Sequence, residues 1–151
     1  MLASVGRRTP VRSACPSDTV DRIVRERRWC HETILQVDDE YAVRSFLAEV
    51  LREAGYFVVE APSGPIALNL VCARAGPVDL VVADMVMPEM SGTELAAALR
   101  RVVPEIPVLF VSGYAPLGDA EAIVTNARTG FLSKPCWRPS LLDAIEQLLR
   151  A

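Results

Sequence analysis

The chain has 151 residues, of which 51% are hydrophobic and 23% are charged, and its formal net charge is −3. This composition is typical of one packed globular domain, and it excludes a wholly disordered chain, a collagen-like repeat and a mini-protein held together by disulfides. The sequence contains no apolar run of the roughly 18 residues that a membrane span needs and no signal-peptide core, and the net charge gives no argument for nucleic-acid binding, so we expect a cytoplasmic protein without a nucleic-acid partner.

The first 32 residues differ from the rest of the chain. They hold seven arginines and four acidic residues, with Pro10, Pro16 and no sustained apolar period, whereas residues 33–151 hold nine basic and fifteen acidic residues. A polar segment without apolar periodicity does not bury enough surface to fold alone. We therefore expect a flexible N-terminal extension over residues 1–32, with a possible short polar helix at 19–29, followed by one domain over residues 33–151.

From Thr33 onward, short apolar segments alternate with segments of helical periodicity. The segments that predict strands are 33–37, 56–60, 78–83, 106–111 and 131–133. The predicted helices have apolar stripes at 43–54 (with Phe46), 66–71 (after an N-cap at Ser63), 95–102 and 141–149, and residues 117–128 carry a weaker pattern. Strands that are apolar throughout are buried on both faces, which favours an α/β fold with a parallel sheet between two helical layers.

Polar side chains follow four of the five predicted strands. They are Asp38 and Asp39 after the first strand, Asp84 after the third, Ser112 after the fourth and Lys134 after the fifth. Ligands of such sheets bind outside the carboxyl ends of the strands, so these side chains are expected to meet there. Lys134 is also the only lysine of the chain. Three converging carboxylates need a cation, and oxygen ligands of this kind suit Mg²⁺, while a lysine and a serine hydroxyl suit an incoming phosphoryl group.

Each of these residues also has a plain structural explanation. An acidic residue after a strand often caps the next helix, as Asp38 or Asp39 would here, and a serine in such a loop often stabilises a turn. The joint placement at one sheet edge is what favours a functional site.

Four blocks of sequence occur in a familiar order. They are Gln36-Val37-Asp38-Asp39-Glu40, then Asp84 to Gly92, then Val111-Ser112-Gly113-Tyr114, and then Phe131-Leu132-Ser133-Lys134-Pro135. Together they resemble the receiver domains of two-component response regulators, and the resemblance covers about residues 33–150. It implies a flavodoxin-like (βα)5 fold, a doubly wound parallel sheet with strand order 2-1-3-4-5.

The resemblance also implies a role for each block. Asp84 is similar to the phosphoacceptor that takes a phosphoryl group from a phosphohistidine on a partner. Asp38, Asp39, Asp84 and the backbone carbonyl of Val86 match the positions that hold Mg²⁺. Lys134 matches the lysine that pairs with the phosphate, and its bond to Pro135 is a candidate cis peptide.

Two further positions match a conformational switch. Ser112 corresponds to the hydroxyl that contacts the phosphoryl group, with the small Gly113 beside it, and Phe131 corresponds to the aromatic ring that turns inward. The sequence departs from the common pattern at Gln36, which replaces an apolar strand residue. It also carries a bulky Tyr114 near the path of hydrolytic water, where we expect slower loss of the phosphoryl group.

The favoured interpretation is that the protein is a stand-alone receiver, or one detached from a hybrid kinase. We expect it to be phosphorylated but not to be a turnover enzyme. Its expected partners are a sensor histidine kinase or histidine phosphotransferase and a downstream protein target, which would bind the fourth helix, fifth strand and fifth helix. We expect a monomer or weak homodimer. The alternatives are a docking module that works without phosphorylation, and an aspartyl-phosphate phosphatase. Aspartyl-phosphate phosphatases need a second acidic residue two positions after the nucleophile, where this chain has Val86.

Overall fold

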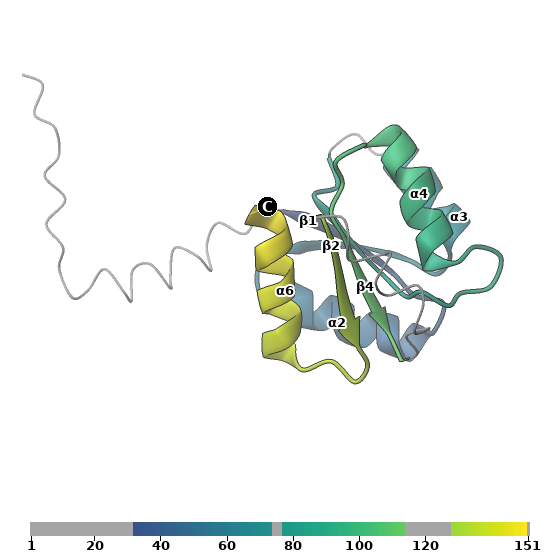
Figure 1. The fold of residues 1–151 in the computed structure, drawn as a ribbon. Coiled ribbons are helices and arrows are strands. Elements are labelled where there is room, and N and C mark those ends of the chain that lie inside the picture. Colours follow the sequence, from purple (N-terminus) through teal and green to yellow (C-terminus); the bar gives the residue numbers. More distant parts are fainter. Residues whose placement is uncertain (1–31, 74–76, 114–127, 151) are drawn as a thin grey trace, which may run out of the picture.

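The order of the strands in the sheet differs from their order in the chain. The computed structural model describes residues 32–73, 77–113 and 128–150, and these form one five-stranded parallel sheet in the order β2-β1-β3-β4-β5 (Figure 1). The strands are β1 (Thr33–Val37), β2 (Phe57–Ala61), β3 (Leu80–Ala83), β4 (Val108–Ser112) and β5 (Thr129–Ser133). The predicted fold class and strand order are therefore confirmed.

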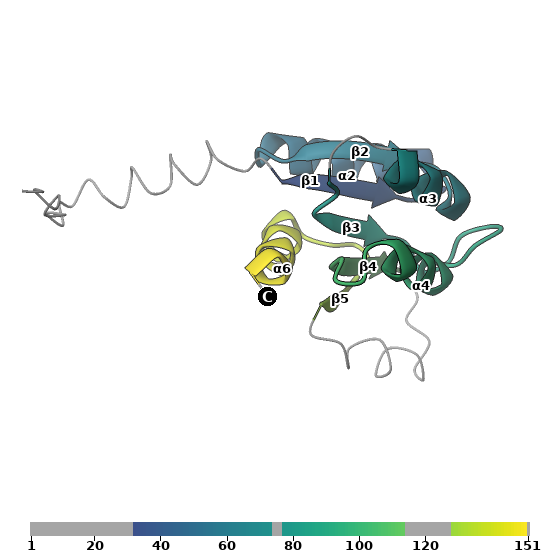
Figure 2. The same ribbon diagram turned by 90° about the horizontal axis from the view of Figure 1, so that it is seen from above.

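Helices cover both faces of the sheet, as Figure 2 shows from above. They are α2 (Tyr41–Glu53), α3 (Gly64–Ala73), α4 (Gly92–Val102) and α6 (Arg138–Arg150). Helices α2 and α6 pack on one face, and α3 and α4 pack on the other. In the ranges that the structure describes, no helix is long and apolar enough to cross a membrane. The helix expected at 117–128, the extension before residue 32 and Tyr114 lie outside these ranges, apart from Arg128.

The two apolar layers follow from the alternation of side chains along each strand. On β1, Ile34 joins the layer under α2 and α6, while Leu35 joins the layer under α3 and α4. Neighbours on β4 divide in the same way, with Leu109 on the first layer and Phe110 on the second. Because successive side chains of a strand point to opposite faces, an uninterrupted apolar run supplies both layers at once.

Local capping sets where the helices begin and end. Gly55 has a φ of 101°, in the left-handed region that glycine enters without strain, and it follows the end of α2. The Ser63 hydroxyl accepts from the amide of Ile66 at 3.4 Å at the start of α3. Helix α4 opens with a capping box, in which the Ser91 hydroxyl accepts from the Glu94 amide and the Glu94 carboxylate accepts from the Ser91 amide.

Several predicted apolar stripes were too wide. Phe46 is 60% exposed, and Ile66 and Val102 are also exposed, although the spacing placed all three among the residues facing the sheet. Phe46 and Ile66 lie at the border of their stripes, and Val102 is the last residue of α4. The strand predictions were right in number and order, but β2, β3, β4 and β5 begin or end one or two residues from the predicted limits.

Candidate functional site

The predicted acidic residues, the serine and the lysine lie at the carboxyl edge of the sheet, whereas Phe131 lies in the middle of β5. Asp38 and Asp39 directly follow β1, Asp84 directly follows β3, Ser112 is the last residue of β4, and Lys134 directly follows β5. In a parallel sheet these ends share one edge, and the order β2-β1-β3-β4-β5 makes the relevant strands neighbours. The topology therefore gathers residues that are up to 96 positions apart in the sequence.

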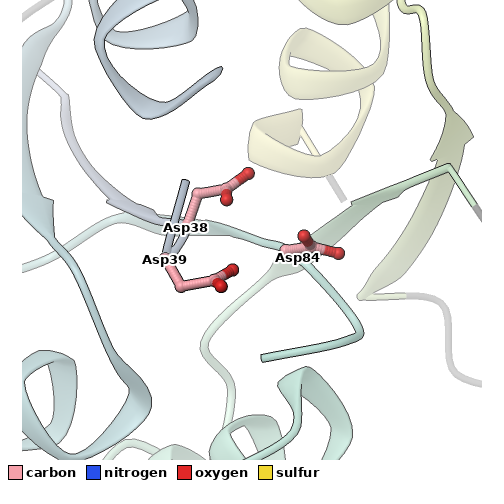
Figure 3. Close-up of side chains that lie close together, drawn as sticks. All are labelled: Asp38, Asp39 and Asp84. Atoms are coloured by element: carbon pink, nitrogen blue, oxygen red, sulfur yellow. The ribbon is translucent and has the colours of Figure 1, made fainter. Parts of the chain in front are cut away.

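The three carboxylates form a cluster. Asp38, Asp39 and Asp84 each offer one oxygen, and these atoms lie within 4.8 Å of one another. Figure 3 shows the side chains of Asp38 and Asp39 extending on the same side of the chain, toward Asp84. Asp38 is buried at 1% exposure, whereas Asp39 is exposed. Hard carboxylate oxygens at this spacing fit Mg²⁺, which typically takes one or two carboxylates and fills its remaining positions with water or phosphate oxygens.

Lys134 joins two of these acids. Its Nζ atom lies 3.0 Å from Oδ2 of Asp38 and 3.3 Å from Oδ2 of Asp84. Burial alone would lower the pKa of Lys134, but its hydrogen bonds to Asp38 and Asp84 and the charges of both acids outweigh burial, so its pKa is raised above its ordinary value. The lysine is therefore a cation at neutral pH.

The backbone orients the other oxygen of each paired acid. The amide of Glu40 donates to Oδ1 of Asp38 at 2.9 Å, and the amide of Val86 donates to Oδ1 of Asp84 at 3.2 Å. Each carboxylate is thus held from both sides, by an amide two residues further along and by the ammonium of Lys134. Asp38 therefore stabilises the turn before α2 and also belongs to the acidic cluster. It does not cap the helix as its structural explanation expected, because the N-cap of α2 is Glu40 and this helix has no side-chain cap.

Ser112 and Lys134 are linked through the backbone. The amide of Lys134 donates to the carbonyl of Ser112 at 2.9 Å, and the Ser112 side chain is buried. The peptide bond between Lys134 and Pro135 is cis, as predicted. Phe131 lies on the edge strand β5, opposite Phe110 in register, and is partly buried against the layer under α3 and α4.

Two residues at the site received no role from the sequence. A Cβ atom on Gly92 would lie 2.2 Å from the backbone oxygen of Asp84, so only glycine fits where α4 begins beside the acidic cluster. Arg44 of α2 donates from Nη1 to the backbone carbonyl of Asp38 at 2.8 Å. For Gly92, the only sequence signal was its place at the end of the block from Asp84 to Gly92. No sequence signal indicated a role for Arg44.

Comparisons with known proteins show the family of the chain. Residues 34–146 match the response regulator receiver domain. The sensor kinase CckA of Brucella abortus is 43% identical over 117 residues, which are 78% of this chain and 12% of CckA. The response regulator receiver protein CpdR of the same organism is 34% identical over 121 residues, which are 78% of this chain and 97% of CpdR.

A solved structure shows the same likeness. The receiver domain of the hybrid histidine kinase CckA superposes with a TM-score of 0.66 at 37% identity, covering 78% of this chain and 98% of that domain. The chain spans 12% of the length of the Brucella abortus sensor kinase CckA and 26% of the length of the transcriptional regulatory protein GlrR of Escherichia coli. It belongs to the family of receiver domains of two-component response regulators.

Proposed function

We propose that this receiver accepts a phosphoryl group on Asp84 from a histidine kinase or a histidine phosphotransferase and passes the signal on by binding a downstream protein. One observation carries the proposal. The ammonium of Lys134 contacts the carboxylates of both Asp38 and Asp84, beside the third carboxylate of Asp39. This arrangement places a cation and a cluster of oxygen ligands around a single partly accessible acid, Asp84, whose side chain is 14% exposed.

The acidic cluster is the proposed magnesium site. Asp38, Asp39 and Asp84 would hold Mg²⁺ together with the backbone carbonyl of Val86. Lys134 carries one positive charge against the three negative charges of Asp38, Asp39 and Asp84, so the site keeps an excess of two negative charges. Bound Mg²⁺ supplies the positive charge that offsets this excess and that stabilises the oxygens of a phosphoryl group during transfer.

The transfer itself needs little from the protein beyond positioning. An oxygen of Asp84 attacks the phosphorus of the phosphohistidine, and the bond between phosphorus and nitrogen breaks with its electron pair passing to the imidazole. Such transition states are loose, with charge spread over the phosphoryl oxygens, so fixed cations provide most of the stabilisation. The amide of Val86 fixes one oxygen of Asp84. The ammonium of Lys134 lies close enough to Asp84 to pair with an oxygen of the transferred phosphoryl group. Because receivers are signalling modules, the product is the modified protein itself.

The proposed output begins at Ser112. Its hydroxyl would contact the phosphoryl group, and the ring of Phe131 would turn inward as Ser112 moves. The hydrogen bond from the Lys134 amide to the Ser112 carbonyl couples β4 to the loop after β5. This coupling supports a movement of both residues when the site is phosphorylated. The change would alter the surface of β5 and α6, where a downstream protein or a second copy of the chain would bind.

Incubation with acetyl phosphate and Mg²⁺, followed by intact-mass analysis, tests the proposal. We expect the mass of one phosphoryl group to be added, and we expect a chelator to prevent the addition. Asp84→Asn should abolish it, whereas Asp143→Asn, which changes an exposed acid on α6, should not. Absence of any modification would support a docking module, and steady release of phosphate from an ester would support a phosphatase.

A further inference from the structure

We propose that Arg44 is a positioning residue for the magnesium site, because it holds the backbone from which Asp38 and Asp39 project. The inference rests on the magnesium binding proposed above. Arg44 lies in the first turns of α2 and its side chain is 13% exposed, so it is largely withdrawn from solvent although arginine usually extends into it.

The guanidinium of Arg44 is held at three points. Its Nη1 donates to the backbone carbonyl of Asp38 at 2.8 Å, its Nε lies 3.7 Å from Oε1 of Glu60 on β2, and its Cζ lies 5.4 Å from the centre of the Tyr41 ring. These contacts join the end of β1, the neighbouring strand and the start of α2. A rigid, planar group with several donors is suited to such bridging, and lysine offers only a point charge.

The contact matters because Asp38 and Asp39 are adjacent residues. Adjacent side chains of an extended strand point to opposite faces, yet one oxygen of each lies within 4.8 Å of the other and of Asp84. Figure 3 shows both side chains on the same side of the chain. The backbone must therefore leave strand geometry after Val37, and the hydrogen bond from Arg44 fixes the carbonyl at the point where it does so.

The charge of Arg44 is balanced away from the acidic cluster. Glu60 pairs with Arg44 and also accepts from Arg52 at 3.1 Å, so the guanidinium faces a carboxylate outside the cluster. Arg44 acts on the metal ligands through the backbone of Asp38. Lys134 provides the cation that touches the carboxylates directly.

Arg52 provides a matched control. It lies on the same helix and contacts the same carboxylate of Glu60, but it also donates to the carbonyl of Val58, and its side chain is half exposed. Arg44→Met and Arg52→Met therefore both remove a partner of Glu60, while Arg44→Met alone removes a contact with Asp38.

The experiment is a calorimetric titration of the full chain with Mg²⁺ alone, without a phosphodonor, at a temperature where circular dichroism shows every variant to be folded. Loss of a group that orients a metal ligand typically weakens metal binding by about 10-fold or more. We expect Arg44→Met to raise the dissociation constant for Mg²⁺ by about that factor, Arg52→Met to change it by less than about 2-fold, and Arg44→Lys to fall between them. If Arg44→Met does not fold, Glu60→Gln, compared with Arg52→Met, tests the same anchor and should weaken binding several-fold.

The possible results separate the two proposals. If the parent protein binds Mg²⁺ and the Arg44→Met and Arg52→Met variants bind it with equal affinity, the role of Arg44 is overturned and the proposed function stays intact. A parent protein that shows no Mg²⁺ binding, with the same result for Asp39→Asn, overturns the magnesium site itself. A selective loss of affinity in Arg44→Met, together with a phosphorylation rate that recovers at saturating Mg²⁺, supports the positioning role.

Discussion

The ammonium of Lys134 lies 3.0 Å from Oδ2 of Asp38, a buried carboxylate that precedes it by 96 residues. This contact ties the loop after β5, an edge strand, to the loop after β1, from which β5 is separated by β3 and β4. It is the contact through which the fold brings the only lysine of the chain into the acidic cluster.

Replacement of this lysine should destabilise the protein in the absence of Mg²⁺. In Lys134→Met, Asp38 keeps its negative charge while buried and loses its cation. Removing one partner of a buried pair typically costs 3–5 kcal/mol, and because the Lys134 side chain is 21% exposed we expect about 1–3 kcal/mol from urea unfolding. Arg138→Met is the control, since it breaks an exposed pair with Glu53 that should contribute under about 1 kcal/mol. Equal losses in both variants would contradict the argument.

The contribution of Lys134 should persist into alkaline solution. Its pKa is raised in the folded state, so the folded protein binds this proton more tightly than the unfolded chain does. By linkage, the stabilisation is complete below the ordinary lysine pKa of 10.5 and is lost as the pH rises through the higher folded value. The difference in unfolding free energy between the parent and Lys134→Met should therefore be constant from neutral to mildly alkaline pH. A decline that begins near neutral pH would indicate a lowered pKa instead.

Much of this site could be predicted because it depends on local pattern. Apolar runs followed by a polar residue define where each strand ends, and parallel strands bring those ends together. That logic predicts Asp38, Asp84, Ser112 and Lys134 at one edge of the sheet, and the structure has them there.

Other features depend on the path of the chain in space and left no local signal. Helical spacing shows which side of a helix faces the sheet, but it does not show how many residues on that side are buried. The spacing therefore predicts that Phe46 faces the sheet, whereas its side chain is exposed and lines a pocket with Pro135 and Cys136. From the sequence, Arg44 is expected to be an ordinary solvent-facing residue of an amphipathic helix. Its hydrogen bond to the carbonyl of Asp38 forms because only three residues separate the end of β1 from the start of α2, so that Arg44 lies close to the end of the strand.

Removal of the exposed acid should stabilise the protein while weakening metal binding. Within the described ranges, no hydrogen bond or ion pair involves the Asp39 side chain, which adds a negative charge to a cluster that already exceeds the charge of Lys134. Asp39→Asn should raise the free energy of unfolding without Mg²⁺ by about 0.5–1 kcal/mol. Asp38→Asn should lower it, because the Asp38 charge pairs with Lys134. Opposite signs in urea unfolding are the expected result, and a loss of stability in both variants would count against charge repulsion.

The buried amide of Gln36 should lower stability. Its Oε1 atom is shielded from solvent and, among the residues that the structure describes, has no hydrogen-bond partner. A buried polar atom without a partner costs about 1–3 kcal/mol, and methionine has a similar shape without the polar oxygen. Gln36→Met should therefore raise the unfolding free energy by about 1 kcal/mol, measured against the exposed control Gln147→Met. A destabilised Gln36→Met would show instead that the amide makes a favourable contact.

Gly92 should tolerate no side chain, because the start of α4 passes against the residue that we propose to be phosphorylated. A Cβ atom there would meet the carbonyl oxygen of Asp84 at 2.2 Å, and that obstacle is backbone, which has no rotamer by which to move aside. Gly92→Ala should cost about 2–4 kcal/mol in unfolding free energy and should also slow phosphorylation by displacing Asp84. Gly113→Ala is the matched control for the unfolding free energy, since its Cβ would first meet Lys134 Cβ at an ordinary 4.0 Å. Normal phosphorylation by a folded Gly92→Ala would mean that Asp84 can shift without losing its function.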